Sequence, residues 1–201
     1  MELLNLPDIR LVRAQYWPSG RAQLTNIALL SIMANADTYL PNFGQTKKMH
    51  RPVDIDHLYP DPDADLPILL IATKATVLPG GKVTPKDSHW KLAWRVGKTH
   101  TGVQIQRELH VIRDVGLNHL TNWGPLTKSC EEYTKAVEVT PRMSLVNRRR
   151  LEKIAAETPV RKPDGLWNCQ NWIRTVFEAA EKQGLFTYRE WTSAIAVVTN
   201  I

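Results

Sequence analysis

The segment Trp167-Asn168-Cys169-Gln170-Asn171-Trp172 opens an amphipathic helix on a cysteine. After this cysteine, apolar residues recur at helical spacing and form one stripe; they are Trp172, Ile173, Val176, Phe177 and Ala180. Asn168 is a favoured N-cap residue, and Gly184 is well placed to end the helix. The pattern predicts a helix over residues 168–182 with Cys169 in its first turn.

The position of Cys169 has a chemical consequence. A helix N-terminus carries partial positive charge and unpaired N–H groups, which favour a thiolate and lower the pKa of a cysteine there. The same N–H groups can form part of an oxyanion hole. A free cysteine is also often a small buried hydrophobic residue, so its position alone leaves both interpretations open.

A histidine on a predicted strand could supply the base that a thiol nucleophile needs. Residues 89–96 alternate strictly, with Trp90, Trp94 and their neighbours on one face and His89 on the polar face. Such a histidine could take the thiol proton and return it to a leaving group. The alternative is a surface histidine at a strand edge.

A second strand is predicted over residues 103–112, after a hairpin connection at 99–102. His110 shares its polar face with Gln106 and Glu108. His110 could orient the imidazole of His89, as a third group does in catalytic triads, or it could be a structural histidine. With only two cysteines and no close His/Cys spacing, no metal site is expected. The sequence has no glycine-rich phosphate loop, so no cofactor is expected either.

The remaining chain predicts further strands and helices, which together give an α+β protein with an antiparallel sheet packed against helices. Strands are expected over residues 9–16, 66–78 and 133–139, the last ended by Pro141. Helices are expected over 145–156, with Ser144 as N-cap, and over 188–198, whose end could instead be a strand. Residues 24–32 fit a helix or a buried strand.

Proline content separates the chain into two parts. Residues 38–67 form an irregular, proline-rich stretch, which predicts a surface loop or linker. We therefore expect an N-terminal extension or lid over 1–66 and an α+β domain over 67–201, within one compact unit.

The 201 residues carry a net charge of +6, with 43% hydrophobic and 23% charged residues, as in ordinary globular proteins. The tight basic run Arg148-Arg149-Arg150 lies in a predicted helix near Glu152 and Glu157. This setting favours a solvated helix face over a nucleic-acid patch, so nucleic acid is not an expected partner.

The two cysteines, Cys130 and Cys169, are too few for a disulfide scaffold. An early acid and an early proline do not fit a signal peptide, and the longest apolar stretch, 22–36, is too short to span a bilayer. We expect a cytoplasmic or nuclear protein with reduced thiols.

The combination of these features resembles the circularly permuted papain-like proteins. His89-Trp90 opens a strand, a second histidine lies on the next strand, and the Trp-Asn-Cys-Gln-Asn-Trp helix follows. The superfamily includes relatives of the NlpC/P60 peptidases, lecithin retinol acyltransferase and the PPPDE peptidases. The chain looks most like small fungal proteins with a His-Trp strand and a Trp-Asn-Cys-x-x-Trp helix, over residues 87–186.

The resemblance implies a cysteine-dependent acyl-transfer enzyme acting on a peptide, amide or ester. Cys169 would be the nucleophile, His89 the base and His110 the polar third member. The residues expected around the substrate or oxyanion are Asn168, Gln170, Trp90 and Trp167. Retinoid or phospholipid transfer is not expected, because the acyltransferases have Asn-Cys-Glu-His at this helix start. The alternatives are a non-catalytic binding module on the same fold and a basic nucleic-acid-binding protein.

Overall fold

The computed structural model describes residues 38–47, 49–73, 87–130, 133 and 135–199. Residues Thr38–Ile201 form one compact unit. The segments predicted over 9–16 and 24–32 lie outside the described residues.

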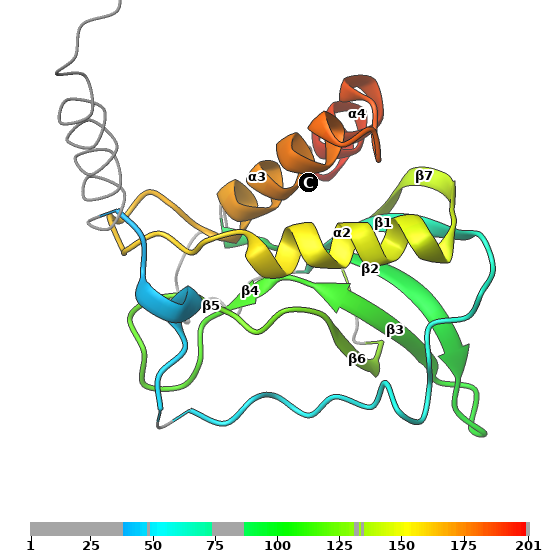
Figure 1. The fold of residues 1–201 in the computed structure, drawn as a ribbon, viewed down its shortest axis with the longest axis horizontal. Coiled ribbons are helices and arrows are strands. Elements are labelled where there is room, and N and C mark those ends of the chain that lie inside the picture. Colours follow the sequence, from blue (N-terminus) through cyan, green and yellow to red (C-terminus); the bar gives the residue numbers. More distant parts are fainter. Residues whose placement is uncertain (1–37, 48, 74–86, 131–132, 134, 200–201) are drawn as a thin grey trace, which may run out of the picture. The chain divides into compact units, whose positions relative to one another are not determined.

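A five-stranded antiparallel sheet in the order β6-β3-β2-β1-β7 is the framework of this unit (Figure 1). Its strands are β1 (Leu66–Thr73), β2 (His89–Lys98), β3 (Gln104–Leu109), β6 (Leu126–Ser129) and β7 (Lys135–Met143). A separate short pair joins β4 (Val111–Ile112) to β5 (Thr121–Asn122). β2 therefore lies at the centre of the sheet, and His89 is its first residue.

Three helices and one 3-10 turn complete the described unit: α2 (Leu145–Glu157), α3 (Cys169–Lys182), α4 (Tyr188–Thr199) and η1 (Pro41–Gly44). α3 contacts β2 and β4, α4 contacts β7 and β1, and α2 contacts α3. Trp90 and Trp94 of β2 are buried in one hydrophobic core with Trp172 of α3. No helix in the described ranges combines the length and the apolar character that crossing a membrane requires.

The predicted α+β class is confirmed, and so are the strand from His89, the hairpin at 99–102 and the helices that follow Ser144 and Asn168. β1 extends to Thr73, and the rest of the predicted segment 66–78 lies outside the described residues. The helical alternative holds for α4 through Thr199. The short strands β5 and β6 were not predicted, because each offers too few residues for a periodic pattern.

Two strand boundaries were predicted wrongly. Pro141 does not end the strand after 139, because β7 continues to Met143. β7 is an edge strand, and the register of its pairing with β1 shifts near Thr140, where a proline is tolerated. The strand predicted over 103–112 is interrupted at His110, which separates β3 from β4.

Part of the polar face of β2 and β3 is buried, although Arg95 on the same face is exposed. Lys91, Gln106 and Glu108 are all buried, and the Lys91 Nζ atom lies 2.6 Å from Glu108 Oε1. Gln106 Nε2 donates to the same carboxylate oxygen at 2.6 Å. Pairing lets these charged side chains occupy an interior face despite the cost of removing them from water.

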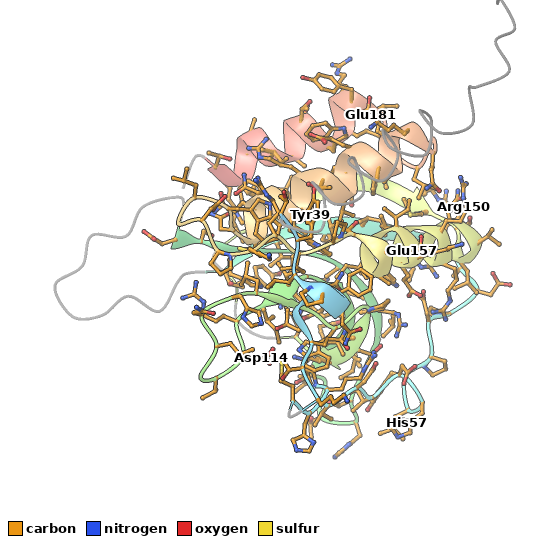
Figure 2. The ribbon with its side chains drawn as sticks, turned by 60° about the vertical axis from the view of Figure 1, so that its left-hand side comes forward. Tyr39, His57, Asp114, Arg150, Glu157 and Glu181 are labelled. Carbon is orange, nitrogen blue, oxygen red and sulfur yellow. The ribbon has the colours of Figure 1, made fainter. Side chains whose placement is uncertain are left out.

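The solvated-face interpretation is wrong for Arg148, the first residue of the basic run. Arg148 is fully buried, and its guanidinium binds both carboxylate oxygens of Asp61, at 2.9 and 3.1 Å. The same side chain also donates to the carbonyls of Pro62, Ala64 and Met143. Arg149 and Arg150 are exposed, and Arg150 lies on the outer side of α2 (Figure 2).

The described part of the proline-rich segment is bound to the domain along its length. Gln45 Nε2 donates to the Asn122 carbonyl, and the backbone of Ile55 pairs with that of Thr127. Together with the Arg148–Asp61 pair, these bonds place residues 38–65 in the same compact unit as the sheet.

Candidate active site

The start of α3 fixes the position of the cysteine. Asn168 caps the helix with its side-chain oxygen, which accepts from the backbone N–H groups of Gln170 (2.9 Å) and Asn171 (3.4 Å). The Asn171 side chain accepts in turn from the Asn168 N–H at 3.0 Å, which completes a capping box. This closed set of bonds fixes the helix start and places Cys169 in its first turn.

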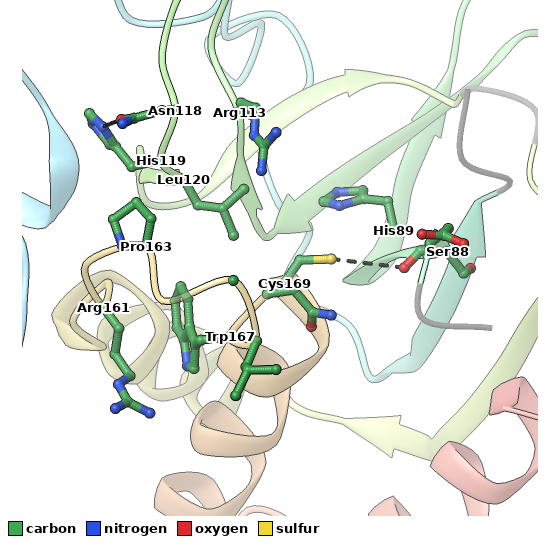
Figure 3. A pocket seen from close by; sticks show the side chains of 14 residues that line it. Ser88, His89, Arg113, Asn118, His119, Leu120, Arg161, Pro163, Trp167 and Cys169 are labelled. Carbon is green, nitrogen blue, oxygen red and sulfur yellow. Dashed lines mark hydrogen bonds between the residues drawn. The ribbon is translucent and has the colours of Figure 1, made fainter. Parts of the chain in front are cut away.

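The Cys169 sulfur lies among backbone groups rather than in water, with only 9% of the residue exposed. Its thiol faces the carbonyl of Ser88 at 3.9 Å, and Gln170 Nε2 donates to that carbonyl at 2.9 Å (Figure 3). Burial raises the pKa of Cys169, and the backbone N–H groups of Trp90, Gln170 and Cys169 only partly oppose this effect. The expectation of a depressed pKa is therefore wrong, because loss of hydration outweighs the helix terminus.

The two predicted histidines are in contact. His89 Nε2 lies 3.0 Å from His110 Nδ1, although His110 is part of neither β3 nor β4. On its other side, His110 Nε2 lies 3.5 Å from Glu108 Oε2. A row of polar groups thus runs from His89 through His110 to Glu108 and then to Lys91.

The pKa of His110 lies well below its ordinary value, first because the ring is buried and then because His89, Lys91 and Lys128 are close. His110 is therefore neutral at pH 7 and carries one ring proton. A proton on Nε2 is favoured by the nearby Glu108 carboxylate, which leaves Nδ1 to accept from His89 Nε2. By this assignment, Nδ1 of His89 is the nitrogen that would accept a thiol proton.

A cavity of about 710 Å³ brings the predicted nucleophile and base together. Cys169 and His89 both line it, and in the view of Figure 3 the thiol is drawn on the same side of the cavity residues as the imidazole. Loop residues before α3 form another wall, where Asp164 Oδ1 accepts from the N–H groups of Leu166 (2.9 Å) and Trp167 (2.7 Å). These hydrogen bonds, that of Trp167 first, lower the pKa of Asp164, so the turn is held by a carboxylate.

The other predicted site residues occupy different places around this cavity. Asn168 and Trp167 line it, whereas Gln170 supports the Ser88 carbonyl. The Trp90 side chain is buried in the core and does not line the cavity; only its backbone N–H is directed at the sulfur.

Sequence reasoning missed several residues that line the cavity: Arg113, Asn118, His119, Leu120 and Arg161. Among them, His119 is held in place by its Nε2, which lies 3.0 Å from the Gly44 carbonyl. The one available signal was the position of Arg113 directly after the predicted strand that carries His110.

Within the described ranges, no three His, Cys, Asp or Glu side chains are grouped as a metal ion would require. Comparisons with protein-family models, curated proteins and solved structures found no match to this chain.

Proposed function

We propose that this chain is a cysteine-dependent acyl-transfer enzyme with a permuted papain-like site, in which Cys169 is the nucleophile and His89 the base. The observation that carries the proposal is the shared cavity, into which one helix start and one strand start bring a thiol and an imidazole. His110 is assigned a positioning role, because its Nδ1 lies 3.0 Å from Nε2 of His89. The order of histidine before cysteine in the chain matches the permuted members of that superfamily.

The chemical steps follow from a resting thiol that is neutral. As the Cys169 sulfur attacks the carbonyl carbon of an amide or ester, a C–S bond forms and the thiol proton passes to His89 Nδ1. The tetrahedral intermediate then breaks its bond to the leaving amine or alcohol, which takes the proton from His89. Water or an amine then attacks the acyl-enzyme carbonyl and gives its proton to His89 as the new C–O or C–N bond forms. The C–S bond breaks, the acid or amide product leaves, and the proton returns from His89 to sulfur, which restores the thiol.

Backbone N–H groups close to the sulfur are the candidates for stabilising the oxyanion. The Gln170 and Asn171 amides are already bound by the Asn168 cap, whereas those of Trp90 and Cys169 come from two different elements around the sulfur. Donors fixed in the backbone need no reorganisation when negative charge develops on the carbonyl oxygen.

A chloromethyl ketone tests this proposal, because it reacts with thiols that are activated by a neighbouring base. We expect labelling at Cys169, located by mass spectrometry of peptides, and the same labelling in Cys130→Ser. His89→Asn should lower the labelling rate about a hundredfold or more, the usual contribution of a general base. Labelling of Cys130 with Cys169 spared would overturn the assignment.

A second candidate, a non-catalytic binding module on the same fold, is favoured by one observation. Burial raises the pKa of Cys169, whereas many thiol nucleophiles have a depressed one. The two candidates differ in turnover: an enzyme releases the chromophore from a panel of p-nitrophenyl esters and anilides and loses this activity in Cys169→Ala. A binding module shows no release that depends on Cys169.

A further inference from the structure

Arg113 gives the cavity a positively charged wall. It directly follows β4, its side chain is exposed, and it lines the same cavity as Cys169 and His89. Figure 3 shows its guanidinium directed into the cavity, near Leu120 and on the side of His89. Among the residues that the structure describes, no side chain or carbonyl forms a hydrogen bond or ion pair with Arg113.

Several other arginines of this domain are paired with carboxylates. Arg107 is paired with Glu152, and Arg148 with Asp61. Arg161, which also lines the cavity, lies 4.0 Å from Asp164. An arginine that faces a cavity without such a partner offers its planar donor fork to a ligand carboxylate or phosphate.

The only acidic side chain that lines the described cavity is Asp87. Asp87 precedes Ser88, and Ser88 lies beyond His89 as seen from Arg113 in Figure 3. Of the two arginines that line the cavity, Arg161 has Asp164 close by, so Arg113 is the one whose charge is available to a ligand. Leu120 and Trp167 supply apolar surface to the same cavity.

We propose that the substrate of Cys169 is an anionic acyl compound whose carboxylate or phosphate group is bound by Arg113 while its amide or ester carbonyl lies at the thiol. This inference rests on the proposed function for the position of the carbonyl. It adds the charge of the substrate and the residue that recognises it, and it places an apolar part of the substrate against Leu120 and Trp167.

The inference is tested with two alkylating reagents of nearly equal size, anionic iodoacetate and neutral iodoacetamide. Each forms a C–S bond with Cys169 and releases iodide, so their rate ratio reports the local charge. On a Cys130→Ser background, we expect the iodoacetate-to-iodoacetamide ratio to fall about fivefold in Arg113→Gln at low salt, as an interaction between unit charges near a surface predicts. The difference should shrink at high salt, where the charges are screened.

Arg142→Gln is the matched control, because Arg142 is exposed on β7, outside the cavity, and its carboxylate partner Asp65 is 3.8 Å away. Its rate ratio should equal that of the parent protein. A ratio that is the same in Arg113→Gln and in the parent overturns the inference. Such a result leaves the proposed function standing, since labelling by the neutral reagent tests the thiol separately.

If neither reagent modifies Cys169, the proposed function fails and anion binding is decided by thermal unfolding. Inorganic phosphate and acetate are each compared with chloride at equal ionic strength. A rise in Tm that occurs in the parent and in Arg142→Gln but not in Arg113→Gln supports the anion site, and the more effective anion identifies phosphate or carboxylate. Equal Tm shifts in all three proteins overturn it.

Discussion

His89 Nε2 and His110 Nδ1 lie 3.0 Å apart, so a second imidazole is in contact with the candidate base. In a hydrogen bond between two imidazoles, one of the two nitrogens carries the proton and donates, and the other accepts. The buried Glu108 carboxylate, 3.5 Å from the other nitrogen of His110, favours one arrangement of protons along the row. The predictions below begin with this arrangement.

We predict that both histidines carry their proton on Nε2 at neutral pH. Long-range proton–nitrogen NMR spectra of the parent protein distinguish the two tautomers of each ring. Glu108→Gln should change the tautomer or broaden the signals of His110, because the amide lacks the negative charge that favours a proton on its Nε2. Protonation of His89 on Nδ1 in the parent protein would contradict this assignment.

The stability of the protein should fall as the pH drops below about 6.5, the ordinary value for histidine. The pKa of His110 is lowered in the folded state, so the unfolded chain takes up a proton first and unfolding becomes more favourable. Between that value and the lower folded pKa, the contribution of this group is about 1.4 kcal/mol per pH unit.

Urea unfolding at pH 7.5, 6.5 and 5.5 measures this effect. His110→Gln should show a smaller loss of stability over the series than the parent protein. His57→Gln is the control, since His57 is exposed in the segment before β1, away from α3 and α4 (Figure 2). Parallel pH profiles for the parent protein and His110→Gln would show that His110 titrates normally.

Alkylation of Cys169 by iodoacetamide should increase with pH, with a midpoint above that of a free thiol. Burial raises the pKa of this group in the folded protein, and the thiolate is the reacting species. The alkylation rate of Cys169 at each pH is measured on a Cys130→Ser background by quenching the reaction at timed intervals and analysing the products by mass spectrometry. A midpoint below neutrality would instead mean that a thiolate–imidazolium pair forms in the resting site.

Removal of Arg148 should destabilise the domain strongly. Arg148→Met leaves the Asp61 carboxylate buried without its bidentate partner, and an uncompensated buried charge costs about 3–5 kcal/mol. The double variant Asp61→Asn with Arg148→Met should recover part of that loss. Arg150 lies in the same helix but is exposed, so Arg150→Met should change the free energy of unfolding by less than about 1 kcal/mol.

Periodicity predicted the parts of the fold that consist of long, regular segments. The apolar stripe after Cys169 and the alternation after His89 correspond to α3 and β2, and Asn168 and Ser144 act as the caps that their side chains predict. The alternation of polar and apolar residues did not predict which polar side chains are buried, because that depends on partners from other strands. Lys91 and Glu108 have polar side chains, but they are buried because each neutralises the other.

The candidate site was predictable only for residues whose position in an element carries chemical meaning. Cys169 at a helix start and His89 at a strand start could be found in this way. The direction of the Cys169 pKa shift could not, because it depends on how much water the folded chain removes from the sulfur. Arg113 and His119 come from connecting segments, and their approach to the cavity depends on the course of loops that no periodic pattern describes.

The interruption between β3 and β4 joins, by a short stretch of backbone, the proposed orienting residue of the base and the proposed anion-binding residue. His110 occupies the gap, and Arg113 follows three residues later on the same chain segment. An insertion or deletion of one residue here would move the orienting imidazole and the guanidinium together, since the side-chain alternation of extended chain would be reversed. Under the proposed function, the spacing between the residue that orients the catalytic base and the anion-binding group is therefore set by the backbone of this one segment.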